Sequence, residues 1–125
     1  MAKLTADLSG RVALVTGGGG VLCSQMAREL ATSGAAVAVM SRTESKIAQV
    51  AADINAAGGK AIAVSCDVLD RPGLEAAREH IEAELGPIDI LINGAGGNHP
   101  LGTATMNHCT PELLADAPKE GRTFF

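Results

Sequence analysis

Four consecutive glycines, Gly17 to Gly20, stand between an apolar run and a segment with helical periodicity. Glycines lack Cβ atoms, so backbone N–H groups in such a turn can approach a pyrophosphate, and the amino end of the following helix adds partial positive charge. Gly18-x-Gly20-x-x-Cys23 fits the G-x-G-x-x-G/A pattern of dinucleotide-binding turns, with cysteine in the last, small position. No Gly-Lys-Ser/Thr follows, so a Walker-type phosphate loop does not fit. The alternative is a glycine-rich turn that binds nothing.

Ser41 and Arg42 stand where a dinucleotide site recognises the ribose of its ligand. Sites for NAD carry an acidic residue about 20 residues past the glycines to hold the ribose 2′-hydroxyl, whereas an arginine accommodates a 2′-phosphate. Here a hydroxyl and a guanidinium replace the acid, with Lys46 one helical turn further on. A guanidinium attracts phosphate and a carboxylate repels it, so we predict NADP(H) as cofactor, with NAD(H) as the alternative. The competing interpretation is that Ser41-x-x-Glu44 forms a capping box and Arg42 is simply solvated.

The elements that must position these residues follow from hydrophobic periodicity. Short apolar runs, typical of strands covered on both faces, occur at 11–16, 36–40, 61–64 and 88–92. Between them lie three amphipathic stripes, from Leu22 to Ala31, from Ile47 to Ile54 and from Leu74 to Leu85. Asp70 is expected to cap the third helix, with Pro72 in its first turn.

This alternation predicts the α/β fold class. We expect a Rossmann-type parallel sheet with helices on both faces, of which this chain holds the amino-terminal part, strands one to four. We expect one domain over residues 1–125, with a loop-rich tail at 97–125 that contains one short helical candidate at 111–115.

The composition excludes several classes of protein. The net charge is −4, without basic runs, so nucleic acid is not an expected partner. No apolar run is long enough for a signal peptide or a membrane span, and a cytoplasmic protein is the default. The three cysteines, an odd number without CxxC spacing, predict neither a disulfide framework nor a metal site, the neighbours His108 and Cys109 included. We expect His80 at the surface.

Four segments together resemble the short-chain dehydrogenase/reductase family. They are TGGGGVLC from Thr16 to Cys23, MSR at the end of the second run, Cys66-Asp67-Val68, and DILINGAG ending at Gly96. In the family's classical register Val21 and Cys23 replace glycines; in that of its extended subfamily only Cys23 departs. The family's classical members carry the motif N-N-A-G, which reads N-G-A-G at 93–96 in this chain. This likeness favours the classical register. Gly94 replaces the second asparagine, which we expect to loosen this loop.

The resemblance implies roles for residues of this chain. The turn would line the phosphates and the nicotinamide side of the cofactor. Asp67 would accept a hydrogen bond from the adenine amino group, with Val68 beside it, unless it is only a turn or capping aspartate. The loop after the fourth strand would pass along the adenosine ribose, unless Asn93 makes only a structural hydrogen bond between strands. The residues in the turn and in this loop are Gly17, Gly19, Gly20, Val21, Leu22, Asn93, Ala95 and Gly96.

The resemblance also implies hydride transfer between a nicotinamide and a hydroxyl or keto group. Members of the family use a tyrosine, a lysine four residues on, a serine and an asparagine, but this chain has no tyrosine. We therefore name no catalytic residue and expect an incomplete, inactive portion of a longer, homo-oligomeric dehydrogenase. GGNHP at 96–100 resembles a branch acting on sugar acids such as mannonate or fructuronate, and Asn98 and His99 could bind such a small-molecule substrate or simply face water.

Two other classes of function compete with this interpretation. One is a nucleotide-binding module without chemistry of its own. The other is a different Rossmann enzyme, such as a methyltransferase, whose cofactor lacks a pyrophosphate. Arg42 would then be unexplained, because such sites usually place an acid at that position to hold the ribose.

Overall fold

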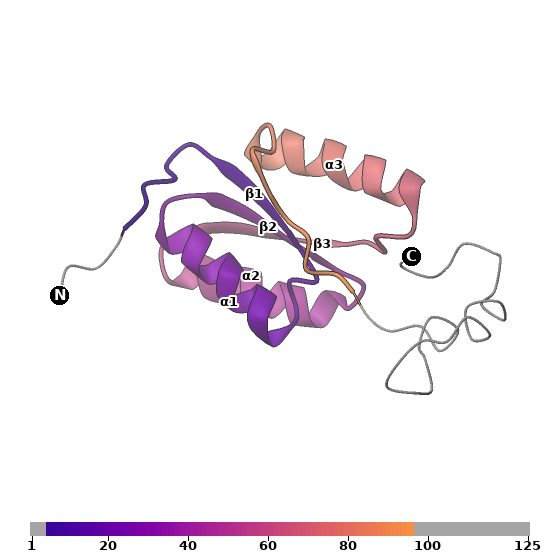
Figure 1. Cartoon of the computed structure of the whole chain (residues 1–125), viewed down its shortest axis with the longest axis horizontal. Coiled ribbons are helices and arrows are strands. Elements are labelled where there is room, and N and C mark those ends of the chain that lie inside the picture. Colours follow the sequence, from indigo (N-terminus) through magenta and orange to yellow (C-terminus); the bar gives the residue numbers. More distant parts are fainter. Residues whose placement is uncertain (1–4, 97–125) are drawn as a thin grey trace, which may run out of the picture. The chain divides into compact units, whose positions relative to one another are not determined.

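A computed structural model describes residues 5–96 of the chain (Figure 1). The described elements belong to one compact unit, Met1–Ala95. They are β1 (Val12–Thr16), α1 (Val21–Thr32), β2 (Ala36–Ser41), α2 (Glu44–Ala56), β3 (Lys60–Ser65), α3 (Arg71–Leu85) and β4 (Ile90–Ile92). The tail at 97–125, with its helical candidate at 111–115, lies outside the described residues, so the extent of the domain remains a prediction.

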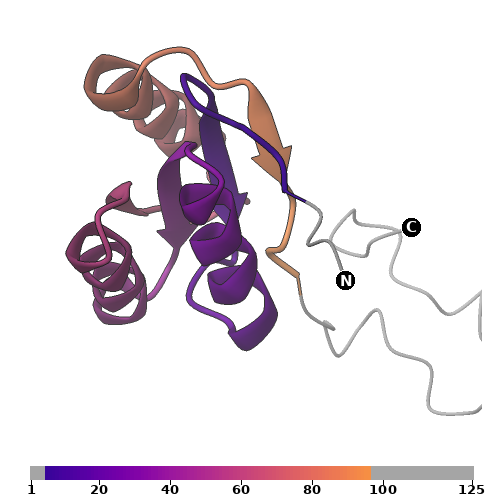
Figure 2. The same ribbon diagram turned by 90° about the vertical axis from the view of Figure 1, so that its left-hand side faces the viewer.

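The four strands form one parallel sheet in the order β3-β2-β1-β4. The chain runs outward from β1 to β3 and then returns past β1 to β4. Because such crossovers are right-handed, this reversal moves the connecting helix to the other face of the sheet. Accordingly, α1 and α2 pack on one face and α3 on the other (Figure 1, Figure 2). The predicted fold class, a parallel Rossmann-type sheet with helices on both faces, is confirmed.

Alternate residues of the strands build two separate apolar layers, because successive side chains of a strand point to opposite faces. Odd-numbered strand residues contact α1 and α2: Ala13, Val15, Val37, Val39 and Ala61, with Ile47, Val50 and Ile54 from α2. Even-numbered ones contact α3: Val12, Ala38, Met40 and Val64, with Ala77 and Ile81. The apolar stripes predicted for α2 and α3 are therefore confirmed. In α1 the prediction fails at Leu22, which is 68% exposed in the first turn, beyond the edge of the sheet.

The fourth strand is shorter than predicted, because Asp89 takes over the pairing before it begins. The Asp89 N–H donates to the Val12 carbonyl at 2.9 Å, and its Oδ2 accepts from the Val12 N–H at 3.0 Å. Its other oxygen pairs with Arg11 at 3.5 Å. One side chain thus fixes the start of β4 against the start of β1.

The third helix begins as predicted. Asp70 is its N-cap residue, and Oδ1 accepts a hydrogen bond from the Gly73 N–H at 3.2 Å, with Pro72 in the first turn. This cap satisfies one of the N–H groups that a helix leaves unpaired at its amino end.

We expect Asp70→Ala to lower the free energy of unfolding by about 0.5–2 kcal/mol, because the cap bond is lost. Urea unfolding followed by circular dichroism measures the change. Glu79→Ala, on the exposed middle of the same helix, is the matched control. Equal shifts for both variants would show that the cap contributes nothing specific.

Candidate functional site

The carboxyl ends of all four parallel strands meet at one edge of the sheet. The strand order reverses between β1 and β4, and in open α/β sheets ligands bind in the crevice at such a switch point. The structure brings the glycine turn, Ser41-Arg42, Asp67-Val68 and the segment 93–95 to this edge, because each lies at the end of a strand or just after it. These predicted site residues therefore share one end of the sheet, and their roles in binding a cofactor remain predictions. Gly96 begins the second unit of the chain.

The turn after β1 requires glycine for two different reasons. Gly17 has a φ of +65°, and a Cβ there would lie 2.5 Å from the Gly94 carbonyl oxygen. Gly18 is buried; its N–H donates to the Met40 carbonyl at 3.0 Å, and a Cβ would collide with the side chain of Val39. The turn therefore presses against β2 on one side and against the loop after β4 on the other.

Helix α1 has an amino end suited to an anion. Its N-cap is Gly20, no side chain caps it, and its first turn holds no acidic residue. The other two helices that the structure describes begin with Glu44 or with the Asp70 cap. The first hydrogen bond within α1 joins the Ser24 N–H to the Gly20 carbonyl at 2.9 Å. The N–H groups of the first three helical residues are therefore left for solvent or a ligand. Val21, 94% exposed, stands at the same end.

Thr16 joins the glycine turn to the loop after β4, a role that our sequence analysis missed. Its buried Oγ1 accepts hydrogen bonds from the N–H groups of Gly94 at 3.0 Å and Ala95 at 3.2 Å. The same hydroxyl donates to the Ile92 carbonyl at 3.4 Å. A buried hydroxyl fully used in this way holds two strand ends together. The sequence signal was a polar residue ending an otherwise apolar strand.

Ser41 ends β2 beside the glycine turn. A Cβ at Gly19 would lie 3.6 Å from Ser41 Oγ and 2.9 Å from Lys46 Cβ, so both residues line the turn. Ser41 Oγ accepts from the Thr43 N–H and donates to the Thr43 carbonyl, each at 3.2 Å. Thr43 is the N-cap of α2, so the alternative of a capping box from Ser41 is wrong. Arg42 and Lys46 are exposed and enter none of the ion pairs in residues 5–96.

Asp67 shapes the turn after β3. Its Oδ1 accepts from the Leu69 N–H at 2.9 Å, and its carbonyl accepts from the Asp70 N–H at 3.0 Å. The turn interpretation therefore holds for one carboxylate oxygen. Oδ2 has no hydrogen-bond partner within the described part of the chain and is the atom that could accept from a ligand. Val68, next to it, is 38% exposed.

Asn93 follows β4 and is exposed. Its side chain makes no hydrogen bond to any residue that the structure describes, so the alternative of an inter-strand bond gains no support. His80 is exposed on α3, as expected. Asn98 and His99, predicted to contact a substrate, lie outside the described residues, as do His108 and Cys109.

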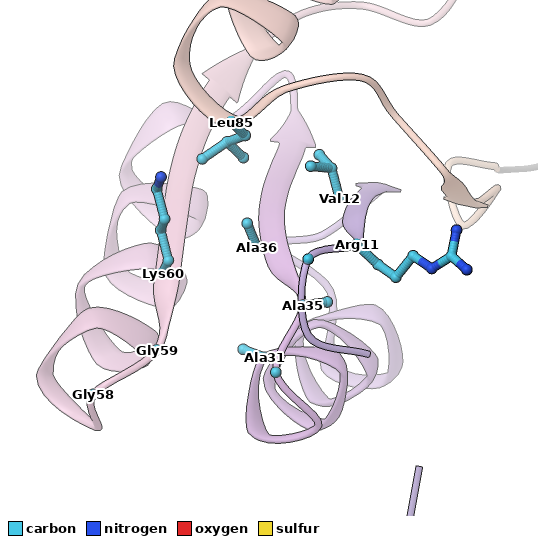
Figure 3. Close-up of a pocket in the computed structure, with 11 residues that line it drawn as sticks. Arg11, Val12, Ala31, Ala35, Ala36, Gly58, Gly59, Lys60 and Leu85 are labelled. Carbon is cyan, nitrogen blue, oxygen red and sulfur yellow. The ribbon is translucent and has the colours of Figure 1, made fainter. Parts of the chain in front are cut away.

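One surface hollow of about 400 Å³ lies at the opposite edge of the sheet (Figure 3). Arg11 and Lys60 stand on opposite sides of it, and Gly34 and Gly58, which follow the ends of α1 and α2, also line it. The carboxyl ends of helices carry partial negative charge, which opposes a phosphate there. This hollow is therefore not the dinucleotide site.

Two further properties hold for the described residues. His, Cys, Asp and Glu side chains form no group that could hold a metal ion within residues 5–96. None of the helices in that range has the length and apolar character that a membrane crossing requires.

Comparisons with known proteins agree with this geometry. The model of the family described as short chain dehydrogenase matches residues 11–114. The uncharacterized oxidoreductase UxuB of Bacillus subtilis (strain 168) is 56% identical over 125 residues, which are 100% of this chain and 43% of that protein.

Among solved structures, a putative D-mannonate oxidoreductase from Haemophilus influenza with bound NAD aligns with a TM-score of 0.75 and 36% identity, over 91% of this chain and 43% of that one. A metagenomic short-chain oxidoreductase in complex with NADP aligns with a TM-score of 0.68 and 37% identity, over 72% of this chain and 41% of that one. The chain thus spans less than half the length of these relatives.

We expect Thr16→Val to lower the free energy of unfolding by about 1–3 kcal/mol, because the N–H groups of Gly94 and Ala95 lose the buried Thr16 oxygen as their acceptor. Urea unfolding measures the loss, and hydrogen exchange at these two amides should accelerate. Thr16→Ser keeps the oxygen and is the control. If the serine and valine variants exchange equally fast, the hydroxyl does not hold this loop.

Burial raises the pKa of the Cys66 thiol, and the carboxylates of Asp70 and Asp67 act in the same direction. Only the thiolate reacts with alkylating reagents, and a raised pKa lowers the thiolate fraction at any given pH. Alkylation of Cys66, followed by mass spectrometry, should therefore reach half its maximal rate at a higher pH than for an ordinary thiol. Asp70→Asn removes a negative charge and should move this pH downward; an unchanged or higher pH would contradict the assignment.

Proposed function

Because this chain belongs to the short-chain dehydrogenase family, we propose that it carries the dinucleotide-binding part of an oxidoreductase that transfers hydride between a nicotinamide and a hydroxyl or keto group. The observation that carries the proposal is the amino end of α1. It has no side-chain cap and no acid in its first turn, it follows a turn of four glycines, and it lies at the strand-order reversal. The family match excludes the methyltransferase alternative.

The residues of this chain would bind and orient the cofactor, which supplies the hydride when bound. The free N–H groups at the start of α1 fit the pyrophosphate. Asp67 Oδ2 fits the adenine amino group as an acceptor, since Oδ1 is used within its own turn. Asn93, Ala95 and Gly96 would form the wall beside the adenosine ribose. Thr16, which holds Gly94 and Ala95, keeps that wall in place.

The cofactor is proposed to be NADP(H). The solved relatives include one with NAD and one with NADP, so membership of the family leaves the choice open. The choice therefore rests on the end of β2. Arg42 and Lys46 are cations without an ionic partner in the described part of a chain whose net charge is −4, and Lys46 lies against the glycine turn. Two cations, one directly after β2 and one in the first turn of α2, suit a 2′-phosphate, which NAD lacks.

The substrate is proposed to be a sugar acid or a similar small polyol. The likeness to a structure named as a putative D-mannonate oxidoreductase supports this class. A cytoplasmic location and a homo-oligomer at full length belong to the same proposal. The alternative function is a nucleotide-binding module without chemistry. An assay of nicotinamide absorbance with sugar acids, run on the full-length protein, distinguishes the two, because only an oxidoreductase would change the absorbance.

Arg42→Ala should weaken binding of 2′,5′-ADP by about ten- to a hundredfold, the value of one charged hydrogen bond to phosphate. Binding of 5′-AMP, which differs only by the 2′-phosphate, should change little. Isothermal titration of both nucleotides measures the difference and needs no catalytic activity.

Arg78→Ala is the matched control for this test, because Arg78 is an exposed arginine on α3, across the sheet from α2. Lys46→Met should also act selectively on 2′,5′-ADP. Equal losses for both nucleotides would remove the argument for NADP(H), and failure of the unaltered protein to bind either one would overturn the dinucleotide site itself.

A further inference from the structure

Two departures of this sequence from the family pattern meet in space. Cys23 stands in the first turn of α1 where a glycine is expected, and Gly94 stands in the loop after β4 where an asparagine is expected. The two residues come from opposite ends of the described chain. A Cβ placed on Gly94 would overlap the Cys23 sulfur and would lie 3.4 Å from Cys23 Cβ.

The glycine at position 94 is required by space and not by backbone conformation. Gly94 is absent from the glycines of residues 5–96 that have positive φ, so an alanine could adopt its backbone angles. What forbids a side chain is the Cys23 sulfur, together with the Thr16 carbonyl oxygen at 2.7 Å. The expectation that Gly94 loosens this loop is therefore wrong. Gly94 instead allows the loop to pack directly on helix α1.

The cysteine has the size that this contact needs. Cys23 is half-buried and packs against the apolar layer between the sheet and the helices α1 and α2. Glycine at position 23 would leave a void beside Gly94, and serine would bring a hydroxyl that needs a hydrogen-bond partner in an apolar contact. A thiol fills the space with little need for a partner.

We propose that Cys23 and Gly94 are a complementary pair that sets the separation between the glycine turn and the loop after β4, and so positions both walls of the nucleotide crevice. This inference rests on the proposed function. Cys23 is a positioning residue in this view, since it acts through the backbone of Gly94 and of α1. The side-chain volume that the family places at position 94 is supplied here by position 23.

A double-mutant cycle tests the pair, with Cys23→Ala, Gly94→Ala and the combination of both. Gly94→Ala alone should shift the urea midpoint downward and weaken 5′-AMP binding, because the new methyl group pushes the loop away from the sulfur. Cys23→Ala removes the sulfur and keeps the helix. The combination should recover part of both losses, with a coupling of at least about twofold in the unfolding constant. Recovery is partial because the Thr16 carbonyl still crowds position 94.

Ile81→Val is the control for a purely structural effect, because Ile81 belongs to α3 and is buried against the other face of the sheet. It should lower the urea midpoint and leave 5′-AMP affinity unchanged. Gly94→Ala should change both.

Additive effects of the two substitutions on stability would overturn the pairing, whatever happens to nucleotide binding. Coupling in stability without any coupling in affinity would overturn the positioning role. If Gly94→Ala does not fold, folding of the combination supports the pair and its failure to fold refutes it. Failure of the unaltered protein to bind 5′-AMP would count against the proposed function alone, because the double-mutant cycle for stability needs no ligand.

Discussion

The backbone of the turn after β1 and the backbone of the loop after β4 approach so closely that neither can carry a side chain at the contact. Gly17 and Gly94 meet there, and the buried Thr16 hydroxyl holds the two segments together. This contact places the start of α1 beside the end of β4. The orientation of α1 and the position of its free N–H groups both depend on it.

Much of this arrangement could be predicted from residue patterns, because the relevant forces are local. The apolar stripe of α2 and the cap of α3 by Asp70 depend on residues close together in the chain, and both were predicted. The glycine turn was recognisable for the same reason. The interpretation of Ser41 as part of a capping box failed because the pattern fits two turn geometries, and here the hydroxyl bonds to Thr43 instead.

The long-range contacts could not be predicted. Thr16 and Gly94 are joined by a hydrogen bond across 78 positions, and no periodicity in the sequence signals it. Asp89 lies within the predicted fourth strand but before the observed one. Its side chain likewise accepts a hydrogen bond from Val12, near the other end of the described chain. Cys23 and Gly94 looked like two unrelated departures from a pattern. Only the fold shows that one compensates for the other.

The apolar layers described above contain alanine, valine, isoleucine and methionine, and the chain holds neither tryptophan nor tyrosine. These 125 residues alone are therefore almost transparent in the near ultraviolet, where most proteins absorb and fluoresce. Emission from a bound reduced nicotinamide would stand against a dark background, with no indole to transfer energy to it. A single tryptophan introduced into the chain would report on its own surroundings alone, because no other indole or phenol side chain would contribute to its absorbance or emission.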